Sequence, residues 1–72
     1  MVWNYRIIKH VDSNNKITFD IREVYYKEQD KIVFSVSEEP AIPSGETALE
    51  LEDDIRLMLE AFEKPILNYS EI

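Results

Sequence analysis

Three stretches in the first half of the chain alternate apolar and polar residues with the period of a β-strand. In "WNYRIIKHV", Trp3, Tyr5 and Ile7 alternate with polar neighbours, and "KITFDIREVYY" and "KIVFSVS" repeat the pattern. A period of two places alternate side chains on opposite faces, so each stretch is predicted to be a half-buried strand. The polar turns "DSNNK" and "KEQDK" separate the stretches, and short connections of this kind favour an antiparallel meander.

The apolar positions of the second predicted strand change sides part of the way along it. Between residues 17 and 21 the apolar positions are odd-numbered, whereas Val24 and Tyr26 are even-numbered. One extra residue in a strand, a β-bulge, has this effect because it disrupts the local ladder and redirects the side chains that follow. We therefore predict a bulge near Glu23.

A helical pattern follows a segment that interrupts regular structure. Between residues 38 and 46, two prolines and the only glycine give the chain room to cross over the sheet. Thr47 is the predicted N-cap, because Glu50 stands three residues later and completes a capping box. The helix is expected to end near Lys64, since Pro65 disfavours helical geometry in the residue before it.

The predicted helix is amphipathic. Its apolar residues recur at helical spacing and form one stripe, composed of Ala48, Leu51, Ile55, Met58, Leu59 and Phe62. This stripe is expected to pack on one face of the sheet, which leaves the other face open, with Ile8, Val24 and Val33 exposed there. The tail "ILNYSEI" is expected to dock Ile66 or Leu67 on the core. The fold class predicted for residues 1–72 is a single small α+β domain, a three-stranded antiparallel meander followed by one C-terminal helix.

Charge is distributed unevenly along the 72 residues, whose net charge is −7. Residues 1–37 contain six Lys or Arg and five Asp or Glu, whereas residues 38–72 contain two and ten. Nucleic-acid binding requires clustered basic residues, so an aromatic platform built from Trp3, Tyr5, Tyr25 and Tyr26 would lack its basic surround. We predict no nucleic-acid partner. The charge suits a basic protein partner, or serves solubility alone.

Candidate chemistry is sparse. The carboxylates of Glu46, Glu50, Asp53 and Asp54 lack the spacing of a calcium-binding loop, and acidic residues near a helix N-terminus also meet the positive end of the helix dipole. A solvated helix face is therefore favoured over a metal site. His10 is the only histidine, with no cysteine to activate and no serine elbow. We predict no enzyme, no cofactor and no metal.

The cellular setting is predicted from what the chain lacks. The N-terminus has no signal-peptide pattern and no stretch is long enough to span a membrane, so a cytoplasmic protein without a membrane partner is expected. Absence of cysteine fits a reducing compartment. A core this small, without a disulfide or metal to strengthen it, favours self-association, and a homodimer is one such assembly.

A candidate partner surface lies on the acidic side of the predicted helix. Glu50, Asp53 and Glu60 flank Leu57, an apolar residue away from the main stripe. An apolar anchor among charges combines electrostatic steering with a desolvated contact. We predict that these four residues meet a basic protein, and that Tyr26 on the open sheet face is a further contact. The alternative is a structural homo-oligomer with no separate ligand.

The chain as a whole resembles a small set of uncharacterised bacterial and cyanobacterial proteins that share "WNYRI", "EVYY", "PSGET" and an acidic helix ending "MLEAFEKPIL". That resemblance implies no known activity. The strands, the run from Pro40 and the helix also resemble HicB-type antitoxin domains, with Pro43, Gly45, Thr47 and the helix through Phe62 as the matching positions. This second resemblance implies a partial RNase H-like fold and a small basic RNase toxin as partner.

Overall fold

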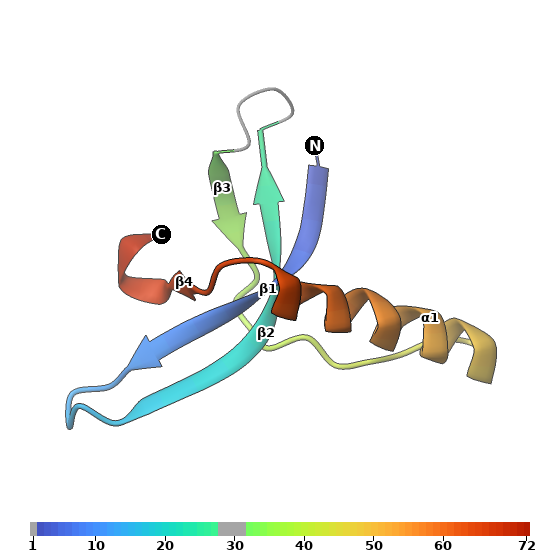
Figure 1. Ribbon diagram of the computed structural model, residues 1–72, viewed down its shortest axis with the longest axis horizontal. Coiled ribbons are helices and arrows are strands. Elements are labelled where there is room, and N and C mark those ends of the chain that lie inside the picture. Colours follow the sequence, from blue (N-terminus) through green and yellow to red (C-terminus); the bar gives the residue numbers. More distant parts are fainter. Residues whose placement is uncertain (1, 28–31) are drawn as a thin grey trace.

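The computed structural model describes residues 2–27 and 32–72. The chain is an α+β protein with a curled mixed sheet and one helix near the C-terminus (Figure 1). The strands are β1 (Val2–Val11), β2 (Ile17–Tyr26), β3 (Val33–Val36) and β4 (Leu67–Asn68), in the order β3-β2-β1-β4. The helix α1 (Ala48–Leu59) continues as the 3-10 turn η1 (Glu60–Glu63), and a second 3-10 turn, η2 (Tyr69–Glu71), follows β4.

The sheet has four strands and is mixed, so the predicted three-stranded, purely antiparallel meander is wrong: it misses a fourth strand. The β1–β2 and β2–β3 pairs are antiparallel as predicted, but β4 runs parallel to β1 and pairs Leu67 with Ile8 and Asn68 with Lys9. Two residues are too few to show an alternation, which is why the sequence predicted only a docked tail. Leu67 does dock on the core around Ile8.

The turn predicted at residues 12–16 joins β1 to β2. The Asp12 carboxylate accepts hydrogen bonds from the backbone amides of Asn14 and Lys16 at 2.8 and 2.9 Å. Asn15 has a φ of 63°, a left-handed conformation that asparagine tolerates better than most residues. The second predicted turn, "KEQDK", lies largely outside the described residues.

The bulge predicted near Glu23 is wrong for the pairing of β2 with β1. Across the described pairs of these two strands the register is unbroken from one end of the hairpin to the other. The register shifts instead between Tyr25 and Tyr26, against β3. The apolar positions of β2 change sides for a different reason, because each face of the sheet is buried along a different part of the strand.

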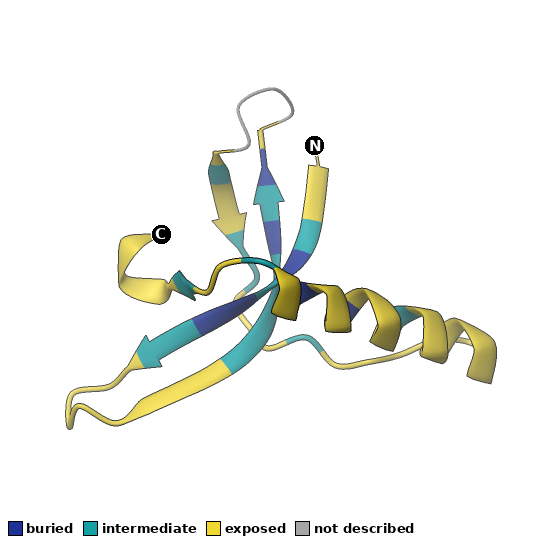
Figure 2. Cartoon of the chain, viewed as in Figure 1, coloured by how far each residue is buried: buried dark blue, intermediate teal, exposed yellow. Residues whose placement is uncertain are grey.

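Both faces of the sheet carry a small core, and the buried residues gather near the middle of the molecule (Figure 2). One core combines β1 with the end of the helix: Tyr5, Ile7, Met58 and Ala61. The other consists of Ile8, Val24 and Tyr26, with Val33, Val36 and Leu67 packed against them. The prediction that Ile8 and Val24 lie on an open face is therefore wrong, because β3 and β4 supply the side chains that cover them.

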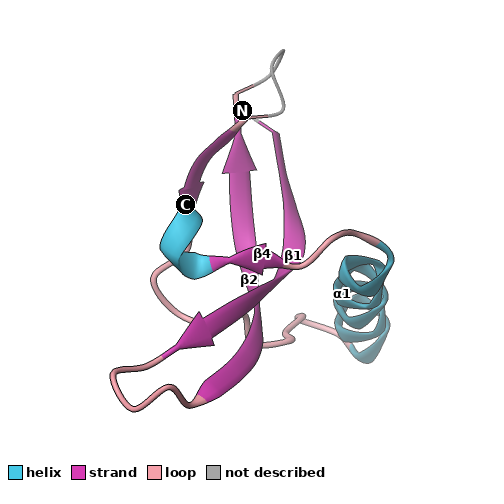
Figure 3. Ribbon diagram, turned by 60° about the vertical axis from the view of Figure 1, so that its left-hand side comes forward, coloured by secondary structure: helices cyan, strands magenta, loops and turns pink. Residues whose placement is uncertain are grey.

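The helix projects away from the sheet instead of lying across it (Figures 1 and 3). Within α1, all of whose residues are described, Met58 alone is buried. The predicted packing of the apolar stripe is therefore wrong for most of its length. We call its remaining members the exposed stripe: Ala48, Leu51, Ile55, Leu59 and Phe62, of which the last four are 36–66% exposed. Asp54, Met58 and Ala61 face β1, and at 3.6 residues per turn the exposed stripe is rotated from them by about a quarter turn.

The helix begins where the sequence predicted, and the helical run ends near Lys64 as predicted, although α1 itself stops at Leu59 and the 3-10 turn η1 completes the run. Thr47 is the N-cap, and its Oγ1 accepts a hydrogen bond from the Glu50 amide at 3.1 Å. Lys64 is extended, with φ −112° and ψ 158°, as expected for the residue before Pro65. Local backbone chemistry therefore determines where the helix starts and stops.

The linker between β3 and α1, residues 37–47, is tied to the sheet and then meets the helix closely. The Ala41 amide donates to the Ile21 carbonyl at 2.8 Å. At Gly45 an added Cβ would lie 2.5 Å from the Leu51 backbone nitrogen. No side chain fits there, so the only glycine of the chain allows the linker to turn against the first turn of the helix.

Candidate functional site

A shallow groove lies between α1 and the first half of β1. Its lining combines two apolar side chains, Trp3 and Leu57, with the carboxylates of Glu23, Glu50, Asp53 and Asp54. No Lys or Arg of the described residues is among the groups that line it. Trp3 is 43% exposed and Leu57 is 47% exposed, so both remain available for contact. We call this surface the acidic groove.

The acidic groove continues toward the C-terminal end of α1. Trp3 and Leu57 also line an adjoining hollow, together with Glu60 and Lys64. The structure therefore brings together the four helix residues predicted as a partner surface, with Glu50 and Asp53 in the groove, Leu57 shared and Glu60 at its end.

Trp3 completes this surface, and sequence reasoning did not assign it there. The ring lies edge-on to Tyr5, with ring centroids 5.1 Å apart and planes at 87°. Aromatic pairs favour this arrangement, which holds the indole in place at low entropic cost. The alternation of β1 indicates which face Trp3 occupies, but its meeting with Leu57 depends on where the helix crosses the strand.

Asp54 joins three segments at the floor of the groove. The Tyr5 hydroxyl donates to Asp54 Oδ1 at 2.6 Å, and the Ser44 amide donates to Oδ2 at 3.1 Å. Burial, followed by the hydrogen bond to the Asp54 carboxylate, raises the pKa of the Tyr5 hydroxyl. The hydroxyl therefore remains a donor at neutral pH. Strand, linker and helix are held together at this one carboxylate, which positions the walls of the groove.

Tyr26 lies in the core, away from the acidic groove. It is 8% exposed, and its hydroxyl donates to Asn4 Oδ1 at 2.8 Å and accepts from Arg6 Nη1 at 2.9 Å. The prediction of Tyr26 as an exposed contact depended on an open sheet face. That face is covered, so Tyr26 is a buried residue with satisfied hydrogen bonds.

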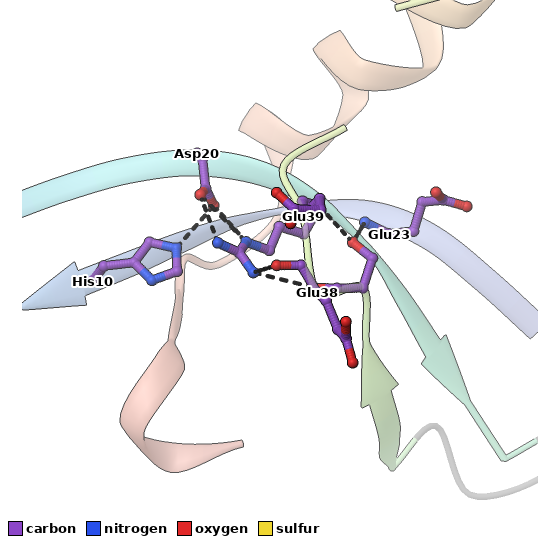
Figure 4. Close-up of polar contacts among 7 residues, drawn as sticks. His10, Asp20, Glu23, Glu38 and Glu39 are labelled. Carbon is purple, nitrogen blue, oxygen red and sulfur yellow. Dashed lines mark hydrogen bonds and ion pairs between the residues drawn. The ribbon is translucent and has the colours of Figure 1, made fainter. Parts of the chain in front are cut away.

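A second polar cluster ties the linker to the sheet (Figure 4). His10 Nε2 lies 2.9 Å from Asp20 Oδ1, and Arg22 Nη2 lies 3.1 Å from Asp20 Oδ2. Arg22 Nη1 also donates to the carbonyls of Ser37 and Glu38 at 3.1 and 2.9 Å. Burial raises the pKa of Asp20, but hydrogen bonds from Arg22 and His10 outweigh it, and the pKa is lowered overall. These groups are occupied with one another, so the cluster is structural.

Two further features of the described residues bear on the kind of site. Among residues 2–27 and 32–72, no three His, Cys, Asp or Glu side chains come together as a metal-ligand set. The carboxylates of the acidic groove are therefore spread along a surface instead of converging on one point. Separately, no helix in this part of the chain has the length and apolar character needed to cross a bilayer.

Comparison with protein-family models, with curated proteins and with solved structures finds no match for the chain. Function is therefore inferred from the chemistry of the acidic groove.

Proposed function

We propose that the protein is a non-enzymatic interaction module whose acidic groove binds a basic protein. One observation carries this proposal: Trp3 of β1 and Leu57 of α1 lie exposed between carboxylates from both sides of the same groove. Charge of one sign on two walls raises the local concentration of a partner of the opposite sign. The two apolar side chains then supply contact area that a partner desolvates.

The chemistry of the groove favours an arginine-bearing segment. A guanidinium stacks on an indole face and also pairs with a carboxylate through two parallel hydrogen bonds. Trp3 offers the ring, and Glu50 and Asp53 offer the carboxylates on the facing wall. Nucleic acid is disfavoured at the same place, because its phosphates carry the charge that the groove repels.

The resemblance to HicB-type antitoxin domains supports the same class of partner, since those domains bind a small basic RNase. We infer an antitoxin-like role in which the groove holds the basic surface of such a toxin. The basic partner is inferred from the groove, and the antitoxin role from the resemblance.

Partner capture followed by a charge-reversal comparison tests the proposal. The tagged protein is used to recover partners from source lysate, and affinities are measured for wild type and for the double variant Asp53→Lys, Glu60→Lys. The matched control is Glu46→Lys, Glu63→Lys, which changes the net charge equally at exposed positions outside the groove lining. We expect the groove variant to bind about tenfold or more weakly than the control, and wild-type affinity to fall with salt.

Trp3 supplies an independent readout, because it is the only tryptophan of the chain and lines the groove. Partner binding there is expected to shift its fluorescence emission, and Leu57→Ser is expected to weaken that binding. Equal affinity of wild type, groove variant and control at every salt concentration would refute the acidic groove as the binding surface.

The second candidate is a structural homo-oligomer with no separate ligand. The exposed stripe favours it, because four large apolar side chains on one side of a helix have no cover within the described chain. The two candidates use different sides of α1, so a charge reversal in the groove is expected to leave self-association intact.

A further inference from the structure

The exposed stripe is the largest feature of α1 that the acidic groove does not use. Ala48, Leu51, Ile55 and Leu59 line a shallow hollow along the helix, flanked by Glu52 and Arg56. At 3.6 residues per turn, this side lies about half a turn from the side that carries Asp53 and Leu57. The helix thus presents two surfaces that different partners can occupy together.

We propose that a second copy of this chain covers the exposed stripe, so that two helices pack against each other and both acidic grooves remain free. This proposal rests on the apolar side of α1 and holds whether or not a basic protein binds the groove.

The surface area of the chain supports a second copy. The described structure exposes 5633 Å², whereas a compact monomer of 8.5 kDa is expected to expose roughly 4,700 Å². Its radius of gyration is 13.2 Å, against about 11 Å for a compact domain of this length. The excess of roughly 1,000 Å² is close to the area that one partner loses in a standard protein interface, about 800 Å².

The stability of the helix points to the same surface. Isolated helices shorter than roughly 12–15 residues are marginal in water, and α1 has 12 residues. Its buried contact with its own chain comes from Met58, near the C-terminal end. The first two turns therefore lack an apolar cover, and a partner on the exposed stripe would supply it.

Charge determines which side of the helix accepts a second copy. Two copies, each with net charge −7, repel each other. The acidic groove would place carboxylates against carboxylates. The exposed stripe is flanked by one acid and one base, Glu52 and Arg56, which form an ion pair at 3.4 Å. Self-association at the stripe therefore avoids facing like charges across the contact.

A two-fold axis near Ile55 gives the pairing its register. Closed dimers place the same patch of both copies in contact, and antiparallel helices set their dipoles in opposition. With Ile55 facing the Ile55 of the second copy, Leu51 of each copy comes opposite Leu59 of the other.

Cysteine cross-linking tests this arrangement directly, because the natural chain contains no cysteine. Ile55→Cys supplies a single thiol near the proposed axis, and mild oxidation is expected to give a disulfide-linked dimer within the native assembly. Leu57→Cys on the groove side is the matched control. Phe19→Cys, at an apolar position that is 56% exposed on β2, is a second control away from α1. Cross-linking as fast at Leu57→Cys or Phe19→Cys as at Ile55→Cys would overturn the proposal.

Sedimentation of the intact chain gives the second measurement. We expect a mass twice 8.5 kDa, and dimer affinity that rises with salt as repulsion between copies is screened. Ile55→Lys is expected to weaken the dimer about thirtyfold or more. Circular dichroism establishes whether this variant folds, and the cross-linking result decides the case if it does not. A monomer at all salt and protein concentrations would overturn the proposed dimer. Unchanged Trp3 emission on adding a basic partner would instead contradict partner binding at the acidic groove, and it would leave the dimer proposal unaffected.

Discussion

The two sides of α1 carry different chemistry and have different surroundings. One side holds Asp53 and Leu57 and forms one wall of the acidic groove beside β1. The other holds Leu51, Ile55 and Leu59 and faces solvent. An apolar stripe therefore identifies a surface that requires a cover without identifying what covers it. In this chain the helix is held through its C-terminal end and through Asp54, and these contacts turn the stripe away from the sheet.

The largest expected effect on stability distinguishes the side of the helix that faces β1, which includes Met58, from the exposed stripe. Met58→Ala removes a side chain that is 6% exposed and packs with Tyr5 and Ile7, and the free energy of unfolding is expected to fall by about 2–4 kcal/mol. Leu59→Ala, at a position 59% exposed, is the matched control and is expected to cost less than about 1 kcal/mol at low protein concentration. Urea denaturation measures both, and equal losses would contradict the distinction.

The next largest effect concerns the linker, residues 37–47, that sets the position of the helix against the sheet. Gly45→Ala adds a methyl group where 2.5 Å separates it from the Leu51 nitrogen, so linker and helix must move apart. We expect the free energy of unfolding to fall by about 1–3 kcal/mol. Partner binding at the acidic groove is also expected to weaken, because the Asp54 carboxylate would no longer be held by the Ser44 amide. Ser44→Ala is the control, since its backbone amide is retained. A variant as stable as the control would show that the close approach relaxes freely.

Tyr5→Phe tests how the groove side is held. The change removes the hydrogen bond to Asp54 while keeping the ring, and a loss of about 1–2 kcal/mol in unfolding free energy is expected at neutral pH. Tyr25→Phe is the control, because that hydroxyl meets Glu23 near the surface.

The same residue gives a pH dependence with a definite sign. Burial and Asp54 raise the pKa of Tyr5 in the folded chain above the unfolded value of about 10. The protonated Tyr5 hydroxyl therefore stabilises the folded chain fully below pH 10, and this stabilisation is lost as the pH rises from there toward the folded pKa. Unfolding free energies measured from pH 8 to 11 should fall less steeply for Tyr5→Phe than for wild type. Identical slopes would contradict the assignment.

The smallest expected effect lies at the free end of the helix. Thr47→Ala removes the hydroxyl that accepts from the Glu50 amide, and stability is expected to fall by about 1 kcal/mol as the first turn frays. Ser13→Ala in the exposed hairpin turn is a suitable control. Since the first turn borders both the groove and the exposed stripe, the variant should weaken both kinds of binding slightly. An unchanged denaturation midpoint would mean that the cap contributes little.

Local features were predictable because they depend on neighbouring residues. The first two strands and the helix follow from their periodicity, and the turn after Asp12 follows from its polar residues. The helix boundaries follow from Thr47 and Pro65. The acidic side of the helix, with Leu57 among its carboxylates, was likewise visible in the spacing of charges. These features rest on contacts within a few residues of the chain.

Contacts between distant segments were decided by the tertiary structure. β4 has two residues, and it is a strand only because it pairs with Ile8 and Lys9, more than 50 residues earlier in the chain. Curling of the sheet buries Val24 and Tyr26 on the face expected to be open, and the crossing point of the helix brings Trp3 to Leu57. Periodicity specifies which side chains share one face of an element. Which faces meet depends on strand curvature and on a few long-range anchors such as Asp54, and those are properties of the packed chain as a whole.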